Sequence, residues 1–476
     1  MAHIECTPAA LYLSRLEQAA DGTLTAVSTG PIDESGVGGG NIHCAGDVTP
    51  WNTHLASEEY EIDARTVQPD GTSPDYPPVG YQYWNFMGAY WQGDLTRTSM
   101  YDYGWIPELT IEDASGTTSL VKQYAMGRFS HELAIVMPDR RTVYLSDDGS
   151  NGGLFLFVAD RVDDLSAGTL YAARWHQLGA EFGGSATLSW INLGHASHGD
   201  IAPLLGPKGV TFDDLMRAED PRADGSCADG LTPVNTMFPA MKGRGAPSFE
   251  CLAVKPGQDR VASRLETRRY AALRGATTEF TKAEGLAVDP STNTVYLALS
   301  AHDRGMTAAH PVWDAGRRDD IAVAENKCGG VYAMPTTGGQ LDSAGAPIKS
   351  DLVAVSIAAG LLGKPLPDGN CEVGSIANPD NLAWMDGADV LLIAEDSKRH
   401  EHNVLWAWKP GSDPVAIATA PAGGEMSGLH YFPDVGGYGY MTLTVQYGWT
   451  MGDSGDAQAG RKSVSGYLGP FPALTP

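Results

Sequence analysis

The sequence has little charge, and positive charge is especially scarce. Only 19% of its 476 residues are charged, and 58 acidic residues outnumber 32 Lys and Arg, which gives a formal net charge of −26. A surface of this sign repels the phosphate backbone, so we exclude nucleic-acid binding. The acidity keeps a protein soluble without any ligand, and part of it is available to bind cations.

Long apolar runs and targeting signals are also missing. No window of 18 apolar residues occurs, so the sequence predicts no membrane span. The first twenty residues lack the positive and apolar regions of a signal peptide. We nevertheless expect a periplasmic or secreted protein whose signal is not present in this chain, because the cysteine count is even and compatible with disulfides.

The cysteines show no CxxC pair and no spacing typical of a zinc site. Among possible pairs, Cys227 with Cys251 is the most reasonable, because these residues bracket a polar segment that a crosslink would hold in place. Helical periodicity is weak as well. The best candidates for short helices are residues 266–274 and 211–219.

The sequence does contain a recurring pattern that is typical of β-hairpins. A short apolar run, a turn with Asp, Pro or Gly, and a second β-rich run occur at residues 133–149, 286–300, 382–397 and, more loosely, 429–448. Repeated hairpins with connections of varied length predict an all-β fold with a single β-propeller over residues 1–476. A pair of β-sandwiches is the rival architecture.

Two long segments interrupt the pattern of hairpins. Residues 67–116 and 197–248 are predicted to project from the rim of the propeller. The first contains the aromatic run YQYWNFMGAYW at residues 81–91. Such runs more often pack than bind, but this one is also a candidate surface for self-association.

Acidic residues stand at the polar ends of the hairpins. In a propeller these positions lie at the ends of inner strands, so carboxylates far apart in sequence can converge on the central channel. Converging carboxylates repel one another unless cations neutralise them, and oxygen ligands suit Ca²⁺ first. The positions are Asp147, Asp148, Glu395 and Asp396 at strand ends, with Glu132, Glu284, Asp380, Asn381 and Glu425 before first strands.

A second acidic position is the pair Glu58 and Glu59, after a Thr-Pro-Trp turn. Adjacent side chains on a strand face opposite ways, so only one of the two is expected to point inward if the segment is extended. On a loop both could reach the same site. Both residues are therefore candidate metal ligands.

Five motifs in order resemble the PhoX family of alkaline phosphatases. Cys44-Ala-Gly-Asp-Val-Thr-Pro-Trp51, followed by Ser57-Glu-Glu59, resembles the family signature Cys-Ala-Gly-Gly-x-Thr-Pro-Trp with its later Thr-Cys-Glu-Glu. The remaining motifs are GRFSHE at 127–132, AEGLAVDP at 283–290, PDNL at 379–382, and Glu425 with the Val-Gln pair at 445–446.

The resemblance implies a six-bladed propeller, export, and calcium and iron ions that bind a small phosphomonoester. It implies that Glu59, Glu132, Glu284 and Asp380 are metal ligands. Arg304 falls near the family's phosphate-contacting arginine and is the candidate catalytic residue, with a solvated loop arginine as the alternative.

Two departures from the family pattern bear on this expectation. Ser57 stands where the family has a cysteine, and a hydroxyl is a poor substitute for a thiolate that holds iron. The sequence therefore predicts Ca²⁺, and leaves Fe³⁺ open. The family's Thr-Asn-Asn is replaced by Ser-Ala-His at residues 300–302, which changes the expected phosphate pocket.

Three functions remain open at this point. The first is a phosphomonoesterase with a calcium-containing site of several carboxylates in the propeller channel. The second is a calcium propeller that hydrolyses lactones, esters or phosphodiesters, because a fold does not fix a function. The third is a non-catalytic module, stiffened by calcium, that binds or assembles through the aromatic run.

Overall fold

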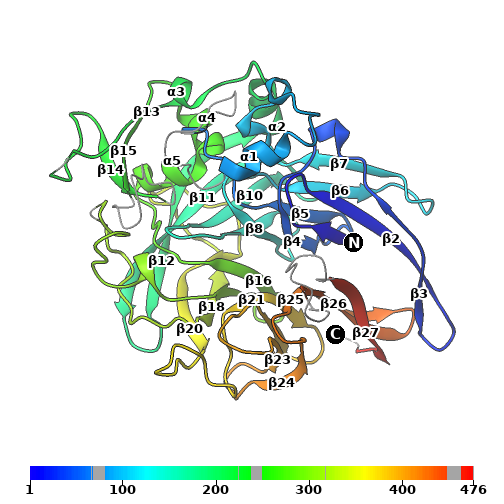
Figure 1. Ribbon diagram of the computed structural model, residues 1–476. Coiled ribbons are helices and arrows are strands. Elements are labelled where there is room, and N and C mark those ends of the chain that lie inside the picture. The colour runs from blue at the N-terminus through cyan, green and yellow to red at the C-terminus, as the bar shows by residue number, and fades with distance from the viewer. Residues whose placement is uncertain are drawn as a thin grey trace, which may run out of the picture.

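Antiparallel sheets lie around a common centre in the computed structural model of this protein (Figure 1). It describes residues 1–65, 67, 81–222, 224–236, 249–316, 318–447 and 463–474. Strands greatly outnumber helices, so the predicted all-β, propeller-like class is confirmed. The number of blades stays a prediction.

Six sheets make up the described part of the chain. One has the order β4 (His43–Val48), β5 (His54–Glu58), β6 (Pro107–Ile111) and β7 (Thr118–Lys122). The largest joins β8 (His131–Val136), β9 (Thr142–Asp147), β10 (Leu154–Arg161), β11 (Asp164–Gly179) and β12 (Ser185–Ser197) to β20 (Ser356–Leu362), β18 (Gly330–Thr337), β17 (Thr294–Leu299) and β16 (Ala283–Asp289), with β19 (Val353–Ala354) beside β18.

The remaining sheets are smaller. One has the order β21 (Pro379–Met385), β22 (Val390–Glu395), β23 (Val404–Trp408) and β24 (Val415–Thr419), and a second has the order β25 (Glu425–Val435), β26 (Tyr438–Gln446) and β27 (Val464–Pro472). A third has the order β13 (Met216–Glu219), β15 (Phe249–Val254) and β14 (Thr232–Asn235), and a fourth has the order β1 (Ala2–Ile4), β2 (Ala10–Gln18) and β3 (Leu24–Pro31). All described pairings within named sheets are antiparallel, as short local connections favour.

The four predicted hairpins are confirmed. They are the antiparallel pairs β8–β9, β16–β17, β21–β22 and β25–β26. Their apolar faces pack against neighbouring sheets: Ile393 of β22 belongs to one core with Val331 of β18, and Leu392 of the same strand belongs to another with Leu429 of β25. Both faces of β22 are therefore buried between its neighbours, as blade packing requires.

Helices are short and lie at the periphery (Figure 1). They are α1 (Tyr81–Met87), α2 (His198–Ile201), α3 (Phe212–Leu215), α4 (Asp259–Leu265) and α5 (Thr267–Arg274), with single 3₁₀ turns at Ser35–Val37, Leu95–Arg97, Met100–Asp102, Tyr124–Met126, Ala202–Leu204 and Arg304–Met306. The helix predicted over 266–274 is confirmed as α5. The one predicted over 211–219 is wrong in its second half, because residues 216–219 pair with β15 as β13.

The N-terminal hairpin packs against the C-terminal sheet. Gln18 Nε2 donates to Val435 O at 2.6 Å, and Leu24 N donates to the Tyr467 hydroxyl at 2.9 Å. The chain's two ends thus lie near each other and close the ring on one side (Figure 1).

The segments expected to be insertions contribute to the body of the protein. Within 67–116, residues 107–111 form β6, and Trp84 and Met87 of the aromatic run are fully buried in a small core with Ile62 and Tyr103. Residues 68–80, 223 and 237–248 of the two segments lie outside the described residues. Trp84 and Met87 of the aromatic run therefore serve packing, whereas Phe86 is 55% exposed.

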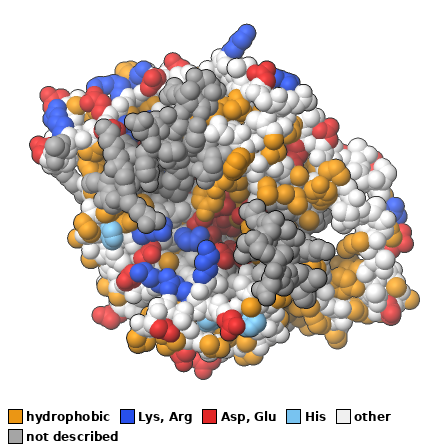
Figure 2. All heavy atoms as spheres, viewed as in Figure 1, with side chains coloured by type: hydrophobic (Ala, Val, Ile, Leu, Met, Phe, Trp, Pro, Cys, Tyr) orange, Lys and Arg blue, Asp and Glu red, His pale blue; other side chains and the backbone are white. Residues whose placement is uncertain are grey.

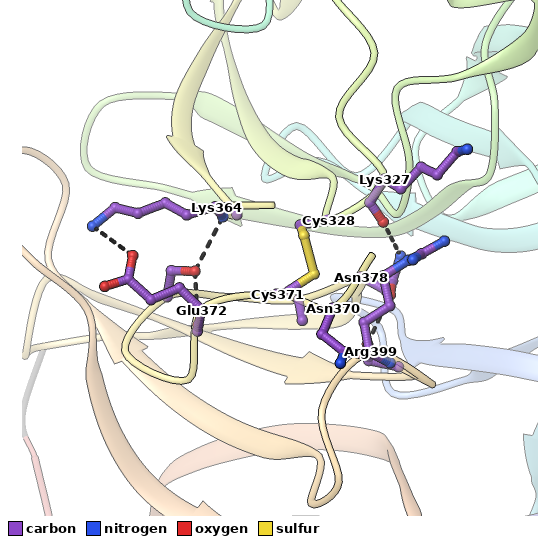
Figure 3. The surroundings of a disulfide bond; sticks show 12 residues. Lys327, Cys328, Lys364, Asn370, Cys371, Glu372, Asn378 and Arg399 are labelled. Carbon is purple, nitrogen blue, oxygen red and sulfur yellow. Dashed lines mark hydrogen bonds and ion pairs between the residues drawn. A yellow bond between two sulfur atoms is a disulfide. The ribbon is translucent and has the colours of Figure 1, made fainter. Parts of the chain in front are cut away.

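Two disulfides crosslink segments that are distant in the sequence. Cys227–Cys251 confirms the predicted pair, and Cys328–Cys371 links the segment before β18 to the loop before β21. Figure 3 shows this second bond, with Lys364 and Glu372 on one side and Lys327 and Arg399 on the other. Cys6 and Cys44 are free thiols. Among the described residues, no helix is both long and apolar enough to cross a membrane.

Candidate metal centre

One irregularity recurs in four hairpins at the centre of the ring. In each hairpin, two residues of the first strand face a single residue of the second strand. Such a β-bulge bends the strand and re-aims a side chain. The first bulged residues are Cys44, Glu132, Glu284 and Asp380, and the small residues opposite them are Ser57, Ser146, Ala298 and Ala394.

The bulged side chains meet other acidic groups in three overlapping sets. Within each set, one donor atom of every residue lies within 4.8 Å of the others. Glu132 and Glu59 each belong to two sets, so the sets are continuous. The sets are Glu132–Glu284–Asp380, Glu59–Glu132–Asp148 and Glu5–Cys44–Glu59, and together they are called the carboxylate cluster here. Figure 2 shows acidic side chains gathered in a central hollow, with Lys and Arg side chains beside them.

Burial and mutual repulsion dominate the electrostatics of this cluster. Burial, followed by the charge of Asp148, raises the pKa of Glu284 to about 7. Burial and neighbouring carboxylates also raise the pKa values of Glu59, Glu132 and Asp380. Each shift reports a carboxylate that loses water and gains like-charged neighbours. Among the described residues, these carboxylates outnumber the cations that pair with them.

Lys282 is a cation that the structure brings into the cluster. Its Nζ lies 2.6 Å from Glu284 Oε1 and 3.2 Å from Asp148 Oδ1. Burial disfavours its charge, but Asp148 and Glu284 outweigh burial and raise its pKa. Burial would raise the pKa of Asp148, but Lys282 and a hydrogen bond from the Tyr60 hydroxyl at 2.9 Å help to lower it. One ammonium thus faces several carboxylates.

A thiol stands in the cluster, although Ser57 replaces the family's second cysteine. Cys44 Sγ donates to the two oxygens of Glu132 at 3.1 and 3.4 Å. Burial, then Glu132, raises the pKa of this thiol. Ser57 lies opposite the bulge instead, and its hydroxyl donates to Ala45 O at 2.6 Å. The replacement at Ser57 therefore does not deprive the cluster of sulfur.

Two of the predicted acidic residues face other partners. Glu58 forms a buried ion pair with Lys122 at 2.8 Å and accepts hydrogen bonds from the backbone of Gly104 and Trp105. Its neighbour Glu59 turns into the cluster, as the alternation of side chains on a strand predicts.

Glu395 likewise has its own set of partners. Its carboxylate accepts hydrogen bonds from Ala377 N, Val404 N and Trp406 Nε1, and it pairs with His400 at 2.9 Å. The structure thus brings neither Glu58 nor Glu395 into the three sets of donors.

Asn381 and Glu425 border the cluster. Asn381 Nδ2 donates to Asp380 Oδ1 at 2.9 Å, while its Oδ1 accepts from Gly428 N at 2.7 Å. Glu425 accepts from Gln446 Nε2 at 3.0 Å. Burial, followed by the charge of Asp396, raises the pKa of Glu425 to about 9. Asn381 thus contacts the cluster through Asp380, and Glu425 is close enough for the charges of Glu5 and Glu284 to raise its pKa as well.

Arg304 lies in the 3₁₀ turn after β17, beside Ser150. Its guanidinium donates to the Ser150 hydroxyl and lies 5.5 Å from the centre of the Trp313 ring. The side chain is 44% exposed, and its nearest acidic partner is Asp303 at 3.8 Å. It is thus a solvent-facing cation beside the loop that carries Asp148.

The sequence interpretation missed three members of the site as functional residues. It includes Asp148 among the hairpin-end carboxylates expected to converge, although not among the proposed metal ligands. Lys282 could have been found two residues before Glu284 in the AEGL motif, and Cys44 as the first residue of its own motif. Glu5 carries no local signal, because only the tertiary fold brings it near Cys44.

The donors present fit hard and borderline cations. The cluster combines buried carboxylates, which suit Ca²⁺, with one thiol, which suits iron. Removing protons from this set would leave several negative charges against one lysine, and bound cations would balance that excess.

Comparisons with known proteins agree with this geometry. The family "Alkaline phosphatase PhoX" matches residues 19–429. A solved structure of Pseudomonas fluorescens PhoX in complex with vanadate, a transition state analogue, is 18% identical with a TM-score of 0.56, covering 90% of this chain and 69% of that one. No curated protein matches the sequence.

Another solved structure, the periplasmic gluconolactonase PpgL of Pseudomonas aeruginosa, is 11% identical with a TM-score of 0.32, covering 97% of this chain and 92% of that one. This likeness is too low to support an argument. The first structural match supports a propeller-like fold, and the family match spans the motifs from Cys44 to Glu425. The chain therefore belongs to the PhoX family of alkaline phosphatases and is a phosphatase-type hydrolase.

Proposed function

We propose that this protein hydrolyses phosphate monoesters at the carboxylate cluster, in the presence of calcium and iron. One observation carries the proposal: four equivalent bulges place Cys44, Glu132, Glu284 and Asp380 at the centre of a propeller-like ring, inside the region matched by a phosphatase family. Small phosphorylated molecules are the proposed substrates.

The residues that would hold the cations follow from the sets of donors. Glu132, Glu284 and Asp380 offer oxygen atoms only, which supports Ca²⁺ there. Cys44 with Glu59 adds a thiolate, which supports iron at that end. When bound, such cations supply the positive charge that stabilises the phosphoryl oxygens during transfer. Asn381 and Glu425 would complete the site at its border.

Lys282 is the proposed contact to the substrate phosphate. Its ammonium is held between Asp148 and Glu284, so it stays charged and faces the place where the carboxylates converge. A phosphate oxygen can accept a charge-assisted hydrogen bond from it. Arg304, beside the Asp148 loop, is proposed to contact the substrate from the rim. During hydrolysis, water adds to phosphorus while the bond to the alcohol breaks and the alcohol takes up a proton.

Export is proposed as well. Cys227–Cys251 and Cys328–Cys371 are disulfides, and such bonds persist in oxidising compartments such as the periplasm or the extracellular space. Trapping free thiols with a maleimide reagent in cell fractions would test this. A protein found reduced in the cytosol would contradict the proposal.

Hydrolysis of p-nitrophenyl phosphate by the purified protein tests the function. Activity is expected with added calcium and iron, loss of activity with a chelator, and a loss of at least a hundredfold in Glu132→Gln. Glu17→Gln is the control, because Glu17 is 63% exposed on β2. A folded protein with metals bound that hydrolyses lactones or phosphodiesters, but no monoester, would overturn the proposal.

A further inference from the structure

The N-terminal segment, residues 1–6, runs beside the carboxylate cluster. It precedes the family match, which begins at residue 19. This segment and the residues after it run beside residues 40–42, just before the β4 strand that carries Cys44: Ile42 N donates to Cys6 O at 2.8 Å, and Ala9 N donates to Gly40 O at 2.9 Å. This course places a Glu5 oxygen within 4.8 Å of donor atoms of Cys44 and Glu59.

His3 fixes this segment to the site. Its Nδ1 lies 2.7 Å from Cys44 O, so Nδ1 carries a proton and donates to the carbonyl. Its Nε2 then accepts from His54 Nε2, at 2.8 Å. The segment is thus bonded to the peptide of the bulged cysteine itself, and a displacement of the segment would also disturb Cys44.

Hydrogen bonding alone does not account for the position of Glu5. Its carboxylate accepts from Gln446 Nε2, but at 3.3 Å, and the same nitrogen lies closer to Glu425 at 3.0 Å and to Ser427 at 3.1 Å. A single amide nitrogen has two protons for these three acceptors. Glu5 is an exposed residue, yet its carboxylate faces a thiol and a second carboxylate.

We propose that Glu5 is a ligand of the metal centre and binds the same cation as Cys44 and Glu59. The inference rests on the proposed metal-dependent function. It assigns residues 1–6, outside the family match, to the metal site, with Glu5 as a ligand and His3 as a positioning residue. A shared cation turns the repulsion among these donors into attraction, which is the reason for a carboxylate at this place.

Metal analysis of Glu5→Gln in the full chain tests the proposal. Wild type, Glu5→Gln and Glu17→Gln are purified with metals, and calcium and iron are counted by mass spectrometry before and after timed exposure to EDTA. Glu5→Gln is expected to release one metal at least about tenfold faster than wild type, whereas Glu17→Gln behaves as wild type. His3→Ala is expected to change release in the same direction by a smaller factor.

The outcomes separate this inference from the proposed function. Wild type that binds metals and hydrolyses p-nitrophenyl phosphate, with a Glu5→Gln variant of identical metal content and release rate, overturns the role of Glu5 alone. Wild type that binds no metal overturns both. Thermal melting of the metal-free proteins checks folding. If Glu5→Gln melts at the same temperature as wild type but retains less metal, Glu5 is a ligand. If Glu5→Gln has both a lower melting temperature and lower metal retention than wild type, Glu5 has a structural role instead.

Discussion

Replacement of Arg268 by leucine should destabilise the protein and loosen its site. Arg268, on α5, reaches Asp147 with Nε at 2.9 Å and Glu61 with Nη1 at 2.7 Å, and the three side chains are 2%, 0% and 3% exposed. Arg268→Leu leaves two carboxylates buried without this cation. Breaking a buried ion pair in this way costs roughly 3–5 kcal/mol. Because Asp147 precedes Asp148, we also expect weaker metal retention.

The loss of folding stability in Arg268→Leu should depend on pH, and the direction of that dependence can be worked out. Burial raises the pKa of Glu61 to about 7 even with Arg268 present, and loss of the arginine would raise it further. A carboxyl whose pKa is higher in the folded state contributes stability that is complete below its unfolded value, about 4.5, and is lost as the pH rises through the folded value. The deficit of Arg268→Leu should therefore be larger at pH 8 than at pH 5.

Urea unfolding of the metal-free protein, followed by tryptophan fluorescence at both pH values, measures the deficit. The matched control is Arg140→Leu, which breaks an exposed ion pair with Asp163 and should leave stability nearly unchanged. An Arg268→Leu variant as stable as the control at pH 8, or a deficit that grows toward pH 5, would refute the reasoning.

Three further changes have defined outcomes. Lys282→Gln should lower kcat/KM for an aryl phosphate by about a hundredfold at unchanged metal content, since it removes an ammonium 2.6 Å from a cluster carboxylate. Glu279→Gln should gain stability over wild type in urea as the pH rises from 5 to 9, because burial raises the Glu279 pKa to about 8. Gly285→Ala should cost roughly 1–3 kcal/mol in the same assay, because its Cβ would lie 2.3 Å from Asp380 O.

Each of these changes has its own check. Lys282→Arg should recover much of the activity that Lys282→Gln loses, and equal activity of wild type and Lys282→Gln would exclude a role in binding phosphate. A pH-independent difference between Glu279→Gln and wild type would contradict the raised pKa. For Gly285, the comparison is Gly374→Ala, where a Cβ meets nothing within 4 Å and should be tolerated.

Much of the fold could be predicted because its units are local. A β-rich run, a turn and a second run fix a hairpin within about fifteen residues, and all four predicted hairpins occur. Non-local pairing could not be predicted in the same way. Residues 211–219 read as a helix, but β15 takes residues 216–219 as a strand partner, so tertiary pairing outweighs local propensity.

Apart from Glu5, the acidic members of the site were visible in the sequence, but their orientation was not. Glu58 and Glu395 have the same chemistry as Glu59 and Glu284, and only their partners set them apart: Lys122 neutralises Glu58, and His400 pairs with Glu395. The orientation of the Cys44 thiol could not be predicted from the sequence either. The spacing of motifs directed attention to Ser57, while the bulge at Cys44 decides which of the two facing residues enters the cluster.

The repeated bulge explains how a ring of ordinary hairpins acquires a candidate metal site. A regular strand would alternate its side chains, so two adjacent residues would serve opposite faces. The extra residue interrupts this alternation at the end of the strand nearest the centre, and a small residue stands opposite each bulge. At Gly285 the two neighbouring backbones approach so closely that a side chain has no space. The close approach of β16 and β21 that requires glycine at position 285 also brings Glu284 and Asp380 together.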